Sequence, residues 1–167
     1  ICDAVGGTKH LKKKLNLSFD EWNVWYHSLE QDKEITRKGR WNRALPLLED
    51  VYNFEDALLV GSMLITFLRN ADRVKVACLA QLVNVIAPIC TSDTGAWRQT
   101  TFYPFEMASR DAHGTVLELR VVSDAYESSF GDAPYVEAAA VLDEEAGSLC
   151  LLLLNRDLNE PREAVCD

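Results

Sequence analysis

The segment with the clearest pattern is Leu15-Asn16-Leu17-Ser18-Phe19-Asp20-Glu21, in which apolar and polar side chains alternate. Alternation with a period of two predicts a β-strand with one face against a core. Large rings follow at once in Trp22-Asn23-Val24-Trp25-Tyr26. The strand is therefore expected to end at Glu21, with aromatic side chains directly behind it.

A helix and a second strand are expected further along the chain. Asn53 can cap a helix that has Asp56 at its third position. The apolar side chains of this helix recur at amphipathic spacing and are Ala57, Val60, Met63, Leu64, Phe67 and Leu68. The helix should end near Asn70, and residues 74–89 are almost wholly apolar, so their start indicates a strand buried on both faces. Strand, helix and strand in this order predict a β-α-β unit.

Two other segments of the first part of the chain have weaker patterns. Residues 27–43 are charged and poor in apolar side chains, which indicates a long surface loop. Residues 97–110 predict a further helix that Pro104 breaks or kinks. Its aromatic side chains are interpreted as helix-packing groups and not as a sugar platform; they are Trp97, Phe102, Tyr103 and Phe105.

The pattern changes at Gly114, where we expect a domain boundary. Three strands are predicted beyond it, at 115–122, 135–142 and 149–154, and residues 143–147 have the composition of a hairpin connection between the last two. The fold class is therefore α/β plus all-β. Residues 1–114 are expected to form part of an α/β barrel, and residues 115–167 part of an antiparallel β-sandwich.

Composition excludes several kinds of partner. The chain has 167 residues, of which 48% are apolar, and its formal net charge is −9. It is long and apolar enough to fold around a core, but its charge would repel a phosphate backbone, so nucleic acid is not expected. The sequence has no signal-peptide pattern and no apolar run long enough to span a membrane, so no membrane partner is expected either.

The cysteines and histidines indicate neither a metal site nor a disulfide framework. The five cysteines are scattered and lack any C-x-x-C spacing, while the three histidines lie in unrelated settings. Cys78 lies in an apolar run and is expected to be a buried, reduced thiol. We therefore expect a reducing compartment, the cytoplasm, and no metal or other cofactor.

Glu21 is the first candidate for a functional residue. Side chains at the carboxyl ends of barrel strands point into the active site. A carboxylate there, walled by Trp22, Trp25 and Tyr26, suits a sugar ring, because indole faces stack on sugar C–H groups while the carboxylate meets the anomeric carbon. The alternative is that Glu21 is a surface acid and the tryptophans belong to the core. The pattern alone leaves both interpretations open.

Gln81 is the second candidate, because it is an amide within an apolar run late in the second strand. A buried amide must be hydrogen-bonded, and the late position again corresponds to the catalytic end of a barrel. The alternative, a Gln81 side chain bonded to neighbouring backbone, is equally compatible with the pattern. Asn84 is interpreted as structural.

Three blocks of the chain resemble one family in the same order. The sequence Leu17-Ser18-Phe19-Asp20-Glu21-Trp22-Asn23-Val24-Trp25-Tyr26 closely resembles the nucleophile segment of glycoside hydrolase family 51. Residues 71–89 and 96–105 resemble two further segments of that family, and residues 140–147 resemble a fourth more weakly. The resemblance covers most of residues 12–156.

This resemblance implies the last strands and helices of a TIM barrel followed by part of a jelly-roll-like β-sandwich. The implied activity is that of a retaining, exo-acting α-L-arabinofuranosidase, which releases terminal arabinofuranosyl residues from arabinan, arabinoxylan and arabino-oligosaccharides through a covalent glycosyl-enzyme. Glu21 is implied as the nucleophile. Trp25 is implied to line the arabinose site and Gln81 to hydrogen-bond the sugar. Members of the family are often homo-oligomers, including hexamers.

One part of the family's machinery has no counterpart in this sequence. The general acid/base of the family is a glutamate after an asparagine on an earlier barrel strand, and the chain contains no Gly-Asn-Glu segment. We therefore expect a fragment that is inactive alone and needs the remainder of the same enzyme as its partner. The alternatives are a non-catalytic carbohydrate-binding or assembly subunit, or a related glycosidase that acts on β-glucan or xylosides.

Overall fold

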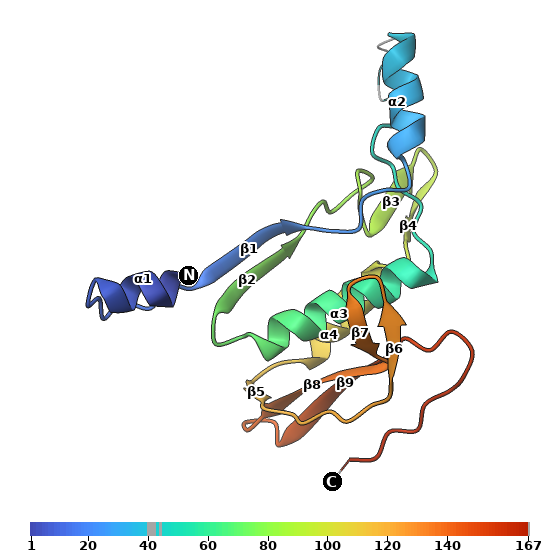
Figure 1. The fold of residues 1–167 in the computed structure, drawn as a ribbon. Helices are drawn as coiled ribbons and strands as arrows, with labels where there is room; N and C mark the ends of the chain where they lie inside the picture. Colours follow the sequence, from blue (N-terminus) through green and yellow to red (C-terminus); the bar gives the residue numbers. More distant parts are fainter. Residues whose placement is uncertain (40–42, 44, 167) are drawn as a thin grey trace.

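The computed structural model describes residues 1–39, 43 and 45–166 (Figure 1). The elements of the first part of the chain are α1 (Cys2–Thr8), β1 (Leu17–Trp22), α2 (Leu29–Lys38), α3 (Phe54–Arg69), β2 (Val74–Leu79), β3 (Ile89–Ser92), β4 (Gly95–Arg98) and α4 (Phe102–Asp111). Those of the second part are β5 (Thr115–Leu117), β6 (Ala125–Ser128), β7 (Gly131–Pro134), β8 (Val136–Asp143) and β9 (Ser148–Asn155). In Figure 1, α1 and α2 project away from the remaining elements.

The predicted β-α-β unit is confirmed. Strands β1 and β2 pair in parallel, with Leu17 opposite Val74 and Trp22 opposite Leu79, and α3 connects them. Because the two strands run in the same direction, their carboxyl ends lie side by side at the same end of this small sheet. The hairpin formed by β3 and β4 lies beyond that end in Figure 1.

Helix α3 is the central element of the fold, and its predicted start and end are confirmed. The Asn53 side chain accepts a hydrogen bond from the backbone N–H of Asp56 (3.2 Å), and the Asp56 carboxylate accepts one from the N–H of Asn53 (2.7 Å), which is a capping box. Asn70 caps the other end. One side of the helix packs on a buried cluster that comprises Trp22, Val24, Tyr52 and Val60.

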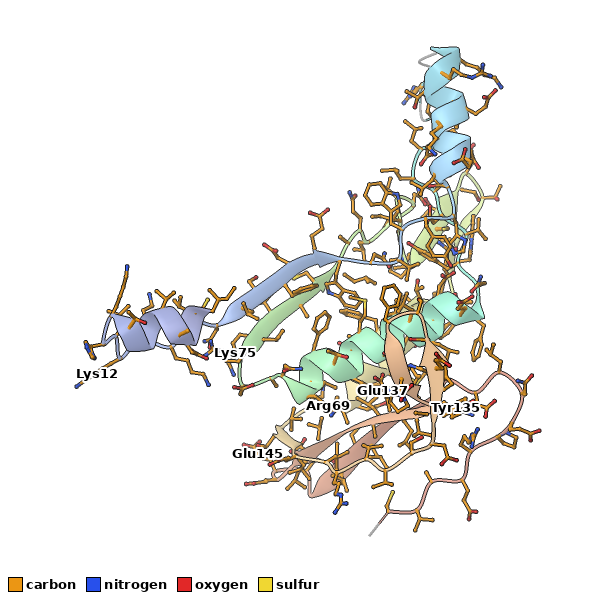
Figure 2. The ribbon with its side chains drawn as sticks, viewed as in Figure 1. Lys12, Arg69, Lys75, Tyr135, Glu137 and Glu145 are labelled. Carbon is orange, nitrogen blue, oxygen red and sulfur yellow. The ribbon has the colours of Figure 1, made fainter. Side chains whose placement is uncertain are left out.

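The other side of α3 packs on the antiparallel part of the chain. Strands β5, β8 and β9 form a three-stranded sheet with β8 in the centre, and β6 and β7 form a separate hairpin. A second buried cluster joins Ile65 of α3 to Ala139 and Leu154 of the sheet. Glu137, labelled in Figure 2, accepts a hydrogen bond from the Ser62 hydroxyl and pairs with Arg156 (both 2.6 Å). The helix is therefore held between the two parts of the chain.

The strands after Gly114 match the prediction in part. β8, β9 and the turn that joins them are confirmed, but the first predicted strand is much shorter and ends at Leu117. The β6–β7 hairpin was not predicted, because its strands have only four residues each and no marked alternation. Gly114 itself is constrained, since its φ is +116° and an added Cβ would collide with the carbonyl oxygen of Leu142.

The predicted loop over residues 27–43 is wrong, because ten of these residues form α2. Residues 40–42 lie outside the described part of the chain. The sequence of α2 is charged on most of its surface, and ion pairs one turn apart stabilise it instead of apolar contacts. These pairs join Glu30 to Lys33, and Glu34 to both Arg37 and Lys38.

The predicted helix over residues 97–110 is also wrong at its start. Trp97 lies in β4 and is half exposed, so it does not pack within a helix. Helix α4 begins at Phe102, which places Pro104 at its third residue. The N–H groups of a first turn have no partner within the helix, so Pro104 neither breaks nor kinks it.

The second strand is less buried than its apolar sequence indicates. Val76 and Cys78 of β2 are exposed, so the prediction of burial on both faces is wrong, as is that of a buried Cys78 thiol. Among the described residues, β2 pairs only with β1, which leaves one of its edges open. No helix in the described part of the chain combines the length and apolar character needed to cross a bilayer.

A cap substitution tests the role of Asn53 in α3. In full-length protein carrying this chain, Asn53→Ala removes the acceptor for the Asp56 N–H and should cost about 1 kcal/mol of local stability. Hydrogen exchange in the first turn of α3 should become about fivefold faster. Asn16→Ala, at an exposed position before β1, is the matched control and should leave that exchange rate unchanged; an equal rate in both variants would contradict the assignment.

Candidate active site

Glu21 lies at the carboxyl end of β1, as the alternating pattern predicts, and its side chain is exposed. The next residue, Trp22, is 5% exposed and packs edge-on against Phe67 of α3. Of the two interpretations that the sequence left open for Trp22, a core residue or a wall of the site, the structure supports the core residue. Phe19 also stacks on Phe67, because the pairing of β1 with β2 is irregular between Phe19 and Trp22, whereas Glu21 between them is exposed.

Gln81 lies just beyond the end of the neighbouring strand. The N–H of Ala80 donates to the carbonyl oxygen of Trp22 (3.0 Å), which continues the parallel pairing past Leu79. The prediction that Gln81 is a buried amide within the strand is wrong, because Gln81 is exposed and lies in the loop that follows β2. Gln81 lines a cavity of about 670 Å³ between the end of β2 and α4.

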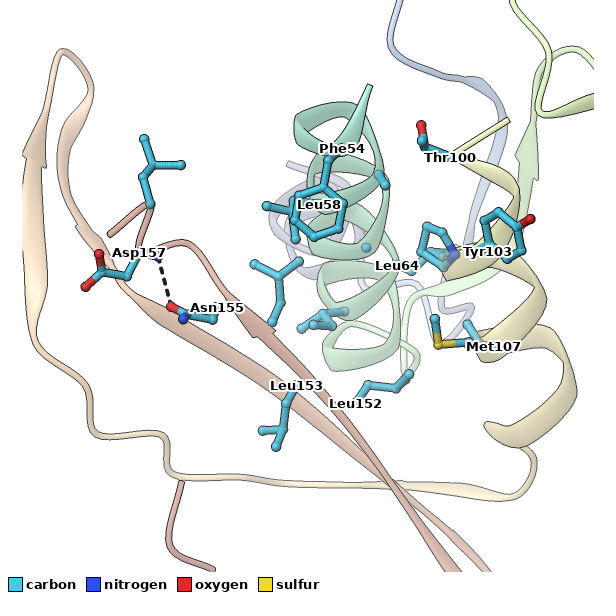
Figure 3. A pocket seen from close by; sticks show the side chains of 17 residues that line it. Phe54, Leu58, Leu64, Thr100, Tyr103, Met107, Leu152, Leu153, Asn155 and Asp157 are labelled. Carbon is cyan, nitrogen blue, oxygen red and sulfur yellow. Dashed lines mark hydrogen bonds between the residues drawn. The ribbon is translucent and has the colours of Figure 1, made fainter. Parts of the chain in front are cut away.

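Trp25 lies four residues beyond Glu21 and is 53% exposed. The structure thus places Glu21, Trp25 and Gln81 on the segments that leave two adjacent parallel strands, at one edge of the sheet. No hydrogen bond joins the three side chains among the described residues. A separate cavity of about 680 Å³ between α3, α4 and β9 is lined mainly by apolar groups and includes none of the three (Figure 3).

Asn23 connects the two strand exits. Its side-chain amide donates to the carbonyl oxygens of Ala80 (2.7 Å) and Ile86, while its oxygen accepts from the N–H of Val24 (2.8 Å). Both carbonyl acceptors belong to the loop that contains Gln81. The backbone that follows Glu21 is therefore tied by one side chain to the backbone around Gln81.

Asp50 holds the backbone that follows Trp25. Its carboxylate is 2% exposed and accepts hydrogen bonds from three consecutive N–H groups, those of Tyr26, His27 and Ser28 (3.0–3.1 Å). Irregular backbone has no ladder or helix to pair its N–H groups, so a buried acceptor is needed there. The negative charge strengthens these hydrogen bonds.

Gln99 extends this polar network to the other loop. Its amide nitrogen donates to the carbonyl oxygens of Asp50 (3.0 Å) and Ala87 (2.8 Å), and its oxygen accepts from the N–H of Tyr52 (3.0 Å). The Tyr52 hydroxyl donates to the carbonyl oxygen of Val24 (2.7 Å). Burial, aided by the negative charge of Asp50, raises the pKa of Tyr52 well above its usual range, which keeps this hydroxyl a donor.

Two aromatic rings and a carboxylate anchor the same segment to the start of α3. The Nε2 atom of His27 lies 2.8 Å from the buried Asp56 carboxylate, and the Tyr26 hydroxyl donates to it at 3.3 Å. The Tyr26 and His27 rings stack with centroids 4.1 Å apart. Desolvation, and then the charge of Asp56, raise the pKa of Tyr26.

The family model for the α-L-arabinofuranosidase C-terminal domain matches residues 20–165. The chain belongs to the α-L-arabinofuranosidase C-terminal domain family. This match confirms the resemblance to glycoside hydrolase family 51, and it includes all three candidate site residues.

Relatives of this chain are substantially longer than the chain itself. It is 54% identical to an intracellular exo-α-(1→5)-L-arabinofuranosidase of Halalkalibacterium halodurans, over 100% of this chain and 33% of that protein. It is 48% identical to an exo-α-(1→6)-L-arabinofuranosidase of Bifidobacterium longum, over 95% of this chain and 31% of the relative. The chain thus spans about one third of the length of these relatives.

Solved structures of family 51 arabinofuranosidases have the same arrangement. A family 51 α-L-arabinofuranosidase from Bifidobacterium longum superposes with a TM-score of 0.85 and 40% identity, covering 95% of this chain and 33% of that one. The thermostable enzyme of Thermotoga petrophila gives a TM-score of 0.70 at 25% identity, covering 87% of this chain and 29% of that one.

The sequence did not reveal the polar network around Asn23, Asp50 and Gln99. Asn23, Asp50 and Gln99 contact backbone far away in sequence, and such contacts leave no periodic signal. Within the described residues, no group of three or more His, Cys, Asp or Glu side chains could hold a metal ion.

The Asp50 network predicts a local effect of charge removal. Asp50→Asn in full-length protein carrying this chain replaces an acceptor with an NH₂ group and leaves at least one backbone N–H unpaired, which costs roughly 1–3 kcal/mol. Hydrogen exchange at residues 26–28 should become about tenfold faster or more. Asp93→Asn, in the exposed turn between β3 and β4, is the control. Unaltered exchange at residues 26–28 would show that Asp50 does not hold this segment.

Proposed function

We propose that this chain is the C-terminal part of a retaining, exo-acting α-L-arabinofuranosidase, a glycoside hydrolase. The observation that carries the proposal is the placement of Glu21 and Gln81 at the ends of adjacent parallel strands, within a chain that belongs to the arabinofuranosidase family. In a β/α barrel the active site lies at the carboxyl ends of the parallel strands.

We infer that residues 1–114 complete a TIM barrel, with β1 and β2 as its last two strands. Each strand has an open edge among the described residues, as expected where further barrel strands pair. Residues 115–167 are inferred to belong to a jelly-roll-like β-sandwich; of these, 167 lies outside the described part. Leu149, Leu151 and Leu153 of β9 are exposed on the sheet face away from α3, where a second sheet would pack.

Glu21 is the nucleophile in this proposal. Its carboxylate oxygen attacks the anomeric carbon of the arabinofuranosyl group, and the bond from that carbon to the leaving oxygen breaks. The glycosyl-enzyme ester is then hydrolysed by water with net retention of configuration. Trp25 presents a ring face to the furanose, and the Gln81 amide hydrogen-bonds a sugar hydroxyl.

The second carboxyl group must come from the remainder of the enzyme. A retaining mechanism needs an acid/base about 5–5.5 Å from the nucleophile, to protonate the leaving oxygen and then deprotonate water. The remainder of the enzyme is therefore the partner that this chain requires, and we propose a homo-oligomer, such as the hexamers of the family.

The proposed substrates are arabinan, arabinoxylan and arabino-oligosaccharides with terminal arabinofuranosyl groups. Relatives at 54% and 48% identity carry names with different linkages, 1→5 and 1→6, so identity at this level supports the sugar more strongly than the linkage. The name of the Halalkalibacterium relative includes the word intracellular, and we propose a cytoplasmic location for this enzyme.

The nucleophile is tested by Glu21→Gln in the full-length enzyme. The amide cannot attack the anomeric carbon, so kcat on an aryl α-L-arabinofuranoside should fall by about 10⁴-fold or more. Asp20→Asn, at the adjacent exposed carboxylate of β1, is the matched control and should keep most of the activity. If Glu21→Gln hydrolysed the substrate at the normal rate, another residue would be the nucleophile.

The need for the rest of the enzyme is tested with the isolated chain. The 18.8 kDa chain, purified alone, should show no turnover of aryl arabinofuranoside, because it holds one of the two carboxyl groups. The full-length enzyme should hydrolyse that substrate and leave the corresponding β-xyloside and β-glucoside intact. Turnover by the isolated chain, or a preference for xyloside or glucoside, would contradict the proposal.

A further inference from the structure

We propose that Asn23 is a positioning residue that fixes the Gln81 loop relative to Glu21. The inference rests on the proposed function, because it assigns Asn23 a role at the same site. Asn23 is two residues from the proposed nucleophile and lies within the segment that ends in Trp25. Its backbone therefore belongs to the segment of Glu21 and Trp25, while its side chain bonds to the loop that contains Gln81.

Every hydrogen-bonding group of the Asn23 side-chain amide has a partner. Both hydrogens of its amide group are used, one by the carbonyl oxygen of Ala80 and one by that of Ile86. Its oxygen is used by the N–H of Val24. The amide can be neither rotated nor replaced by a carboxylate without placing an oxygen against two carbonyl oxygens.

The two acceptors flank Gln81 in the chain. Ala80 immediately precedes Gln81, and Ile86 follows it by five residues, so Asn23 forms hydrogen bonds to both ends of this short loop. Other bonds fix the far part of this loop to different elements: the N–H of Ile86 donates to Leu48, and the Asn84 side chain accepts from the N–H of Thr91 (2.7 Å). Asn23 supplies the side-chain link to the strand of Glu21.

The magnitude follows from the sensitivity of catalysis to geometry. A displacement of about 1 Å in a group that orients substrate can cost about 10²-fold in rate. Asn23→Ala frees both carbonyl groups and lets the loop shift, so kcat/KM should fall by about 10–100-fold. This loss should arise through Gln81 and not through the intrinsic reactivity of Glu21.

A double-mutant cycle in the full-length enzyme tests this route. The proteins are wild type, Asn23→Ala, Gln81→Ala and the double variant, each assayed for kcat/KM on an aryl α-L-arabinofuranoside. If Asn23 acts by placing Gln81, the double variant should be little worse than Gln81→Ala alone. Losses that multiply would overturn the proposal. Asn16→Ala, at the exposed entry to β1, is the control and should leave kcat/KM unchanged.

A second measurement does not depend on activity. Hydrogen exchange at residues 80–86 should be faster in Asn23→Ala than in wild type, and unchanged in Gln81→Ala. Normal exchange in Asn23→Ala would overturn the positioning role of Asn23, whether or not the protein is an arabinofuranosidase. Failure of this inference can therefore be distinguished from failure of the proposed function. Asn23→Ser, which keeps one short donor, replaces Asn23→Ala in both experiments if the alanine variant does not fold.

Discussion

The parallel pairing of β1 with β2 is the constraint on which the candidate site depends. Two strands that run in the same direction must end at the same edge, so residues far apart in sequence leave the sheet side by side. Helix α3 enforces this direction, because it returns the chain to the start of β2 and buries Trp22 against Phe67. Trp22 belongs to the core, and Glu21 beside it is exposed.

Beyond the strand ends, buried polar side chains replace the regular ladder. The backbone that leaves β1 has no helical or strand partner until α2, and Asp50 accepts three of its N–H groups. Asn23 joins that backbone to the loop after β2, and Gln99 joins the backbone of Asp50 to the same loop. Such a network defines one arrangement of the two loops, because every side-chain donor and acceptor of Asn23, Asp50 and Gln99 has a partner within it. In the proposed active site, such rigidity would keep the catalytic groups in position.

Local patterns predicted the elements that depend on local physics. The alternation that ends at Glu21 and the capping pair Asn53 and Asp56 produce the strand end and helix start that the structure contains. Helix α2 was missed because ion pairs, not an apolar face, stabilise it. Gln81 was predicted to be buried because the residues around it are apolar. In this chain, however, apolar side chains of β2 such as Val76 are themselves exposed. The long-range contacts of Asp50 and Gln99 have no sequence signature.

A crystal structure of the full-length enzyme with bound arabinose is the most direct test of this account. The account predicts that the carboxylate of Glu21 faces the anomeric carbon from the mouth of the barrel, with the ring of Trp25 beside the furanose and the amide of Gln81 within hydrogen-bonding distance of a sugar hydroxyl. A sugar bound elsewhere, or a Glu21 side chain directed into bulk solvent away from Trp25 and Gln81, would contradict it.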